Sequence, residues 1–243
     1  MDTAPLPYRL DPAPLALGLV VLQSDESVED DMRRLIPPGA SLLVSRVPSG
    51  AEVTPQTLAA MERHLTGAAA LFPQGKRFAA MGYGCTSGAA QIGPAQVAAR
   101  LRAGAGAAHV TDPVTALIAA CRALGLRRLG MVSPYVAPVS ARLRGVLGAA
   151  GIDTPVFHSF EVAEESRVVR IAPDSLRAAA HAVAAGGGID ALFLSCTNLR
   201  TLDVIDPLEA ALGLPVLSSN LVLGWHMARL AGLGLAQLVS APR

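Results

Sequence analysis

Two short stretches of this chain place a cysteine directly after a run of apolar residues. "MGYGCTSG" contains Cys85 and "LFLSCTNL" contains Cys196, and each cysteine is followed by a threonine. Both positions are expected at the carboxyl end of a buried strand, which is where ligands bind in open α/β sheets. Two thiols on opposite sides of one carbon atom can take a proton from one face and return a proton to the other. The same pair can act as nucleophile and acid on an activated double bond.

The residues that follow each cysteine favour an anionic sulfur and an anionic ligand. We expect a helix N-terminus after each motif, and its free N–H groups should lower the pKa of the thiol from about 8.5. Short hydrogen-bond donors adjoin each sulfur, namely Thr86 and Ser87 in the first motif and Thr197 and Asn198 in the second. Such donors suit a carboxylate or an enolate. We therefore predict a pocket in which these four residues surround the two thiols.

Other uses of the cysteines agree less well with the sequence. Either cysteine alone would be an unremarkable core residue, and Cys121, inside a helical pattern, is predicted to be one. An odd, small number of cysteines does not indicate a disulfide framework. The five histidines are scattered without metal-ligand spacing, so no metal site is predicted. A hydrolase nucleophile turn requires a small residue two positions before the nucleophile, where this chain has Tyr83.

Composition excludes several classes of function. The net charge of +1 over 243 residues, without a basic block, argues against a nucleic-acid partner. No run approaches the ~18 apolar residues of a membrane span, and the apolar run at 15–22 lacks the features of a signal peptide. We expect a cytoplasmic protein without a membrane partner. Lys76, the only lysine, lies between a helix and a strand, which is a poor position for pyridoxal phosphate, and no cofactor is predicted.

Apolar runs that alternate with helical patterns predict an α/β fold with mainly parallel sheets. The expected strands are residues 15–22, 42–47, 78–83, 129–133, 156–160, 191–195 and 216–217. Helices are expected after Thr54-Pro55 and Asp112-Pro113, from Pro138 and Pro173, and over 218–231. The Asp112 helix should end at Gly125.

The matched cysteine motifs indicate two pseudo-symmetric, Rossmann-like lobes with the active site in the cleft between them. We assign residues 1–112 plus 216–243 to the first lobe, which carries Cys85, and residues 113–215 to the second lobe, which carries Cys196. The last helix is expected to fold back onto the first lobe. Alanine-rich helices are compatible with a homo-oligomer.

Four segments together resemble the Asp/Glu racemase superfamily. They are "GCTSG" at 84–88, "SPY" at 133–135, "SCTNLRT" at 195–201 and "LPVLSSNLVLGWHMARLAG" at 214–232. The similarity is greatest to the branch of maleate cis-trans isomerase and arylmalonate decarboxylase, with the racemase-like protein of ectoine-utilisation clusters. By this resemblance Cys85 is the nucleophile, Cys196 exchanges the proton and Tyr135 binds a substrate carboxylate. Arylmalonate decarboxylases have glycine at the first position, so Cys85 favours an isomerase or racemase.

The chain departs from that resemblance at two positions. Where the isomerases carry substrate-binding asparagines, this chain has Asp25 and, in the best match, Glu165. Acidic residues facing a dicarboxylate repel it unless they are protonated, so the resemblance does not extend to maleate itself. The acidic variant would suit a ligand with an ammonium or amidinium group. Alternatively, Asp25 and Glu26 form a solvated loop or a helix cap.

Some roles stay open at this point. Ser218, Ser219 and Asn220 could cap the last helix or line the pocket, and Arg200 could bind a carboxylate or form a surface ion pair. Trp225 is most simply a core or dimer contact. We predict a cofactor-independent isomerase or racemase of a small carboxylate. The alternatives are a decarboxylase of a malonate-type acid that uses Cys196 alone, and a non-catalytic binding protein.

Overall fold

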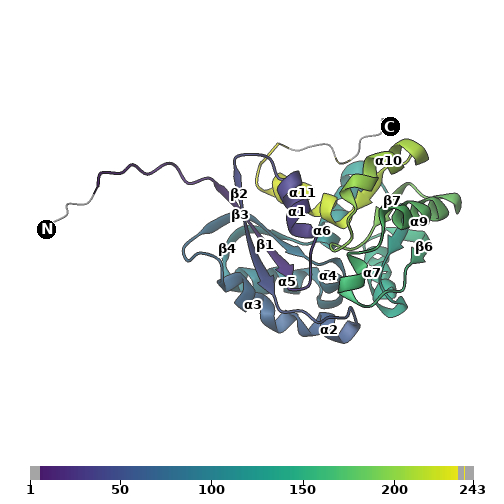
Figure 1. The fold of residues 1–243 in the computed structure, drawn as a ribbon, viewed down its shortest axis with the longest axis horizontal. Coiled ribbons are helices and arrows are strands. Elements are labelled where there is room, and N and C mark those ends of the chain that lie inside the picture. The colour runs from purple at the N-terminus through teal and green to yellow at the C-terminus, as the bar shows by residue number, and fades with distance from the viewer. Residues whose placement is uncertain (1–5, 235–237, 239–243) are drawn as a thin grey trace.

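Eight strands form two parallel sheets of four in the residues that the structure, a computed structural model, describes: 6–234 and 238 (Figure 1). The first sheet contains β1 (Leu15–Leu22), β2 (Ala40–Val47), β3 (Arg77–Gly84) and β4 (Gly106–Thr111). The second contains β5 (Arg128–Ser133), β6 (Asp153–Ser159), β7 (Ala191–Leu194) and β8 (Val216–Ser218). The orders β2-β1-β3-β4 and β6-β5-β7-β8 are equivalent, which confirms the prediction of two similar α/β lobes.

Helices connect the strands, and most begin where the sequence predicts. They are α1 (Val28–Leu35), α2 (Pro55–Ala60), α3 (Glu62–Ala70), α4 (Thr86–Ile92), α5 (Pro94–Gly104), α6 (Pro113–Leu124), α7 (Ala137–Ala149), α8 (Glu165–Val168), α9 (Pro173–Ala185), α10 (Leu202–Leu212) and α11 (Ser219–Leu230). The Asp112 carboxylate caps α6 by accepting hydrogen bonds from the N–H groups of Val114 and Thr115, at 2.9 and 3.0 Å. Gly125 ends α6 in the left-handed conformation, with φ 71°.

The two central strands of the first sheet, β1 and β3, are buried on both faces, as their apolar runs require. Along β1, Leu17, Leu19 and Val21 pack against α1 and α11, while Val20 and Leu22 face the opposite layer with α3. Because α11 comes from the end of the chain, it fastens the C-terminal segment onto the first lobe, as predicted (Figure 1).

Two features of the strands differ from the sequence prediction, and the starts of α1, α3, α5, α8 and α10 were not predicted. The strand β4 was not expected, because its residues are mostly small and half exposed at the edge of the sheet, without an apolar run. The predicted first lobe resumed at residue 216, but β8 pairs with β7 in the second sheet, and α11 is the element that returns. Residues 1–5, 235–237 and 239–243 of the predicted first lobe lie outside the described residues.

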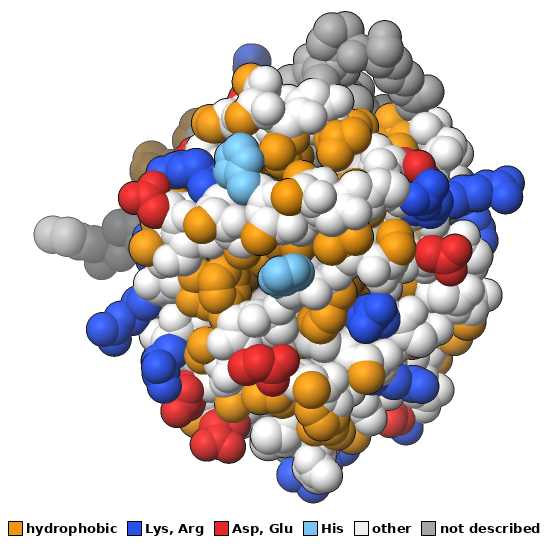
Figure 2. Space-filling view, turned by 90° about the vertical axis from the view of Figure 1, so that its right-hand side faces the viewer, with side chains coloured by type: hydrophobic (Ala, Val, Ile, Leu, Met, Phe, Trp, Pro, Cys, Tyr) orange, Lys and Arg blue, Asp and Glu red, His pale blue; other side chains and the backbone are white. Residues whose placement is uncertain are grey.

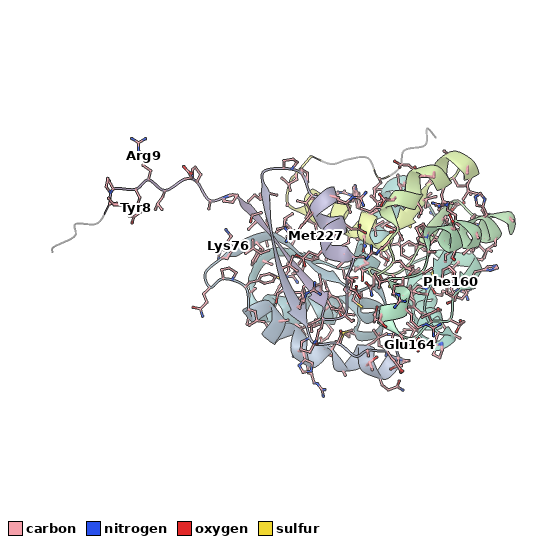
Figure 3. All side chains as sticks on the ribbon, in the orientation of Figure 1. Tyr8, Arg9, Lys76, Phe160, Glu164 and Met227 are labelled. Carbon is pink, nitrogen blue, oxygen red and sulfur yellow. The ribbon has the colours of Figure 1, made fainter. Side chains whose placement is uncertain are left out.

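The two lobes also pair through their loops. The N–H of Val53 donates to the carbonyl of Ala163 at 2.8 Å, and the N–H of Glu165 donates to the carbonyl of Ala51 at 3.1 Å. Glu164, labelled in Figure 3, lies at this boundary and forms a single antiparallel bridge with Glu52. This pairing fixes the backbone of Glu165 beside the first lobe.

The surface shows no concentration of one charge on the face formed by the second lobe, where acidic and basic side chains are interspersed (Figure 2). None of the helices in the described part of the chain has the length and apolar content that a membrane span requires. Lys76 precedes β3 and Cys85 follows it, so the lysine lies at the opposite end of that strand from the thiol (Figure 3).

Gly104 offers a test of the packing between α3 and α5. A Cβ at this position would lie 2.7 Å from the Cβ of Ala69 and would also collide with the backbone of α3. We expect Gly104→Ala to lower the free energy of unfolding in urea by about 1–3 kcal/mol through overpacking. Gly67→Ala, in α3 with open space around it, is the control and should raise stability by about 0.5–1 kcal/mol. Equal effects of the two substitutions would contradict the close approach.

Candidate active site

The first cysteine lies where β3 passes into α4. Cys85 is the N-cap of α4, and its sulfur accepts a hydrogen bond from the N–H of Gly88 at 3.2 Å. The hydroxyl of Ser87 lies 3.7 Å from the same sulfur. The predicted arrangement of a thiol at a helix N-terminus is therefore confirmed for Cys85.

Gly88 is required because two functional groups converge on its α-carbon. A Cβ there would lie 2.6 Å from the Tyr83 hydroxyl and 2.9 Å from the Cys85 sulfur. Tyr83 is fully buried, and its hydroxyl donates a weak bond, 3.8 Å long, to the sulfur of Met61 and also interacts with the sulfur of Cys85. A thiolate at Cys85 would be a better acceptor for this phenol. Sequence reasoning treated Tyr83 only as an obstacle to a nucleophile turn; its spacing of two residues from Cys85 was the available signal.

The second cysteine has a different local structure. Cys196 follows β7, but α10 begins only at Leu202, so the prediction of a helix N-terminus directly after this motif was wrong. Cys196 instead has a φ of 137°, which side-chain-bearing residues rarely adopt and which costs about 1–3 kcal/mol. Its N–H donates to the hydroxyl oxygen of Ser219 at 3.0 Å.

Hydrogen bonds join the two cysteine motifs across the lobe boundary. The Ser219 oxygen also accepts from the hydroxyl of Thr86 at 2.7 Å, so one atom contacts both motifs. The hydroxyl of Thr197 donates to the carbonyl of Gly84 at 3.1 Å, directly before Cys85. The structure thus brings the two predicted motifs together, with both cysteines at their junction.

Tyr135 and Glu165 lie within electrostatic reach of both thiols. The side chain of Tyr135 is 1% exposed, and its hydroxyl interacts with the side chains of Cys196 and Ser195 without a hydrogen bond of ordinary geometry to any described residue. Burial raises its pKa, and thiolate charge at either cysteine would raise it further. The Glu165 carboxylate raises the pKa of Cys85 and of Cys196, although burial is the larger cause for each.

The acidic candidates are held by specific hydrogen bonds. One carboxylate oxygen of Asp25 accepts from the N–H groups of Ser27 and Val28 at 2.9 and 2.8 Å, so Asp25 does cap the start of α1. Its other oxygen is buried and has no partner among the described residues. Asn198 links the two acidic segments, because its amide oxygen accepts from the N–H of Glu26 at 2.9 Å and its amide nitrogen donates to Glu165 at 2.8 Å.

The expectation of a lowered thiol pKa was wrong for both cysteines. Burial raises the pKa of Cys85 to about 12, and the N–H of Gly88 and the hydroxyls of Ser87 and Tyr83 oppose that shift only in part. Burial likewise raises the pKa of Cys196 well above its usual value. Loss of water around the sulfur outweighs the helix N-terminus and the nearby donors. Both thiols are therefore neutral near pH 7 in this closed arrangement.

The first residues of the last helix, α11, contribute side chains to the site. Ser218 caps α11 by accepting from the N–H of Leu221 at 3.2 Å, whereas Ser219 belongs to the site. Asn220 donates to the carbonyl of Thr197 at 2.9 Å and to the carboxylate of Asp31 at 2.7 Å. Burial raises the pKa of Asp31 to about 6. Sequence reasoning did not single out Asp31, whose position on α1 gave no motif.

Arg200 and Trp225 lie outside this cluster. Arg200 lines a cavity of about 130 Å³ with Ser27 between α1 and the start of α10. Ser27 also donates to the carbonyl of Thr197 at 2.7 Å, so this cavity adjoins the second motif. Trp225 stacks on His226 with ring centres 5.7 Å apart, and the guanidinium of Arg229 lies over its ring.

A sequence profile for arylmalonate decarboxylase matches residues 94–240. The chain belongs to the arylmalonate decarboxylase family. This confirms the predicted branch of the Asp/Glu racemase superfamily. A maleate isomerase of Nocardia farcinica (strain IFM 10152) is 30% identical to this family member over 218 residues, which cover 84% of each chain.

Two further relatives of this family member are informative. An arylmalonate decarboxylase of Bordetella bronchiseptica is 33% identical over 125 residues. These residues cover 51% of this chain and 52% of that protein. A solved structure of Nocardia farcinica maleate cis-trans isomerase is similar over 90% of this chain and 93% of that chain, with a TM-score of 0.78 and 28% identity. That structure is of a cysteine-to-serine variant with a covalently bound succinylcysteine intermediate. These relatives are enzymes.

The contact between Tyr83 and Gly88 can be tested by paired substitutions. We expect Gly88→Ala to lower stability by about 1–3 kcal/mol, since its Cβ would collide with the Tyr83 hydroxyl. Tyr83→Phe removes that oxygen, so Tyr83→Phe combined with Gly88→Ala should recover part of the loss. Urea unfolding of the four proteins measures this coupling. Strictly additive effects would show that the two residues do not meet.

The buried carboxyl of Glu165 predicts a specific dependence of stability on pH. Burial raises its pKa to about 7, so the folded protein retains a proton that the unfolded chain releases near pH 4.5. This stabilising contribution is complete below about pH 4.5 and is lost as the pH rises through 7. Glu165→Gln should therefore gain up to about 3 kcal/mol relative to the wild type between about pH 5 and 8, measured by urea unfolding. Glu164→Gln, an exposed neighbour paired with Arg167, is the control and should follow the wild type.

Proposed function

We propose that this chain is a cofactor-independent isomerase or racemase of a small carboxylate, with Cys85 and Cys196 as the reacting pair. The observation that carries the proposal is the junction at Ser219, where one oxygen holds both cysteine motifs. The Nocardia relative with a succinylcysteine intermediate supports chemistry in which a family cysteine bonds to a substrate carbon.

In the proposed reaction both thiols act on the substrate, on one carbon as a racemase and on neighbouring carbons as an isomerase. As a racemase, one thiolate removes the α-proton, so that the C–H bond breaks, an S–H bond forms and the electron pair moves into the carboxylate as an enediolate. The other thiol returns a proton to the opposite face. As an isomerase, the Cys85 thiolate adds to one alkene carbon, the alkene electrons move into the neighbouring carboxylate as an enediolate, and Cys196 protonates the other carbon. After rotation about the new C–C single bond, Cys196 removes that proton and the C–S bond breaks as the alkene re-forms and the Cys85 thiolate leaves.

The surrounding residues suit a carbanion-like intermediate. Tyr135 presents a buried hydroxyl without a partner in the described residues, which is a donor ready for a carboxylate oxygen. The N–H of Gly88 and the hydroxyls of Ser87 and Tyr83 lower the pKa of Cys85 against the effect of burial, so they stabilise the thiolate once it forms. We propose Thr86, Thr197 and Asn198 as groups that position the pocket, since each bonds another part of the protein.

A decarboxylase is the second candidate, and the family profile and the Bordetella relative favour it. In that reaction the C–C bond to the departing CO₂ breaks, its electrons form an enediolate, and Cys196 protonates the carbon. Cys85 has no part in this scheme.

Replacing each cysteine separates these reactions. For an isomerase or racemase, Cys85→Ala and Cys196→Ala should each lower kcat/KM by more than about 1000-fold, because each removes one of two required proton or carbon transfers. The measurements are α-proton exchange with D₂O by NMR and CO₂ release from phenylmalonate. Cys121→Ala is the control, since that thiol lies in α6 and not at the lobe junction.

Full exchange activity in Cys85→Ala would remove the two-thiol mechanism. Release of CO₂ that survives loss of Cys85 but not of Cys196 would select the decarboxylase instead. Circular dichroism of each variant verifies that the fold persists.

A further inference from the structure

The charges around the two thiols are unbalanced. Asp25 and Glu165 are 5% and 6% exposed, and no lysine, arginine or histidine is among the buried side chains of the described part of the chain. Arg46, which acts electrostatically on Asp25, donates to its main-chain carbonyl at 2.9 Å, and the arginine side chain is 45% exposed. The interior of the site therefore contains the carboxyl groups of Asp25 and Glu165, with that of Asp31 next to Asp25, and no buried cation.

Hydrogen bonds place these carboxyl groups near each other. The side chain of Asn198 spans from the N–H of Glu26, next to Asp25, to the carboxylate of Glu165, at 2.9 and 2.8 Å. The charge of Asp25 also raises the pKa of Glu165, which agrees with a short separation. Neither position is easily rearranged, because Asp25 caps α1 and the backbone of Glu165 pairs with Ala51.

Four buried polar atoms in the site lack hydrogen-bond partners among the described residues, namely the second carboxylate oxygen of Asp25, the hydroxyls of Tyr135 and Ser195, and the amide oxygen of Asn220. The Asp25 oxygen can only accept when ionised, whereas the Tyr135 hydroxyl can donate. Buried polar atoms without partners are costly and indicate a ligand that supplies them. A ligand that satisfies the Asp25 and Tyr135 atoms needs a donor group at one end and an acceptor group at the other.

We infer that the substrate is a small amino acid, whose positively charged nitrogen Asp25 and Glu165 bind while Tyr135 binds its carboxylate. This inference rests on the proposed two-thiol function and names its substrate class. A dicarboxylate would add negative charge beside two carboxyl groups, whereas an ammonium group forms charge-assisted hydrogen bonds with them. The ammonium group also makes the neighbouring C–H more acidic, which assists removal of the α-proton by a thiolate.

The test is a binding experiment with matched probes. Butyrate, succinate, 4-aminobutyrate and the two enantiomers of 2-aminobutyrate are titrated against the intact chain by calorimetry near pH 7.5. We expect 2-aminobutyrate to bind at least about 10-fold more tightly than butyrate or succinate. Tighter binding of succinate, or no detectable binding of any amino acid, would overturn the inference.

Charge-neutral variants locate the effect. Asp25→Asn and Glu165→Gln keep the hydrogen-bond acceptors that cap α1 and bind Asn198, so folding should persist. Each should reduce the preference for 2-aminobutyrate over succinate by about 10-fold or more. Glu62→Gln, which removes an exposed carboxylate paired with Arg100, is the control and should leave the preference unchanged. An unchanged preference in both site variants would also overturn the inference.

The same samples distinguish this inference from the proposed function. If 2-aminobutyrate binds through the two carboxyl groups but exchanges no α-proton with D₂O, the substrate class stands and the two-thiol mechanism falls. If exchange occurs on a dicarboxylate and requires both cysteines, the mechanism stands and the amino acid assignment falls.

Discussion

The hydroxyl oxygen of Ser219 is the point on which the arrangement of the site depends. It accepts one hydrogen bond from Thr86 and one from the backbone of Cys196, so it connects the helix after one cysteine to the strained turn at the other. Both lone pairs of this oxygen then accept hydrogen bonds, and its O–H remains a donor for a third group. Since Ser219 begins α11, which packs on the first lobe, this helix sets the separation of the lobes at the thiols.

Burial is the second constraint, and it works against the chemistry that the cysteines suggest. Burial removes water from both sulfurs and keeps them protonated, despite donors that favour the thiolate. The proposed reaction therefore requires a change at the lobe junction, or a charge that a ligand introduces, to form a thiolate. The raised pKa of Glu165 has the same origin, because burial is its largest cause as well.

Local sequence signals predicted much of this protein. Apolar runs located seven of the eight strands, and proline after threonine or aspartate located helix starts, because both signals depend only on neighbouring residues. The two cysteine motifs were recognisable because a thiol after a buried strand is unusual twice in one chain. By contrast, β4 is held by pairing with β3 and not by its own composition, so no local pattern revealed it.

The properties of the site that depend on tertiary contacts could not be predicted. Desolvation of Cys85 comes from both lobes closing around it, and the helix expected after Cys196 is replaced by a turn that Ser219 supports. Asp31 belongs to the site through its hydrogen bond with Asn220, which is distant in the sequence. Tyr83 belongs to it because its hydroxyl approaches the α-carbon of Gly88. The acidic replacement at Asp25 was visible in the sequence, but only the structure separates its capping oxygen from the free one.

The equivalent strand orders carry a stereochemical consequence. Each cysteine follows the third strand of its own sheet, so the two thiols occupy equivalent positions in the two lobes. In the proposed reaction, a carbon bound between them would meet one sulfur on each side. Handedness then has to be imposed by what is unequal between the lobes, such as the relaxed backbone at Cys85 against the twisted backbone at Cys196.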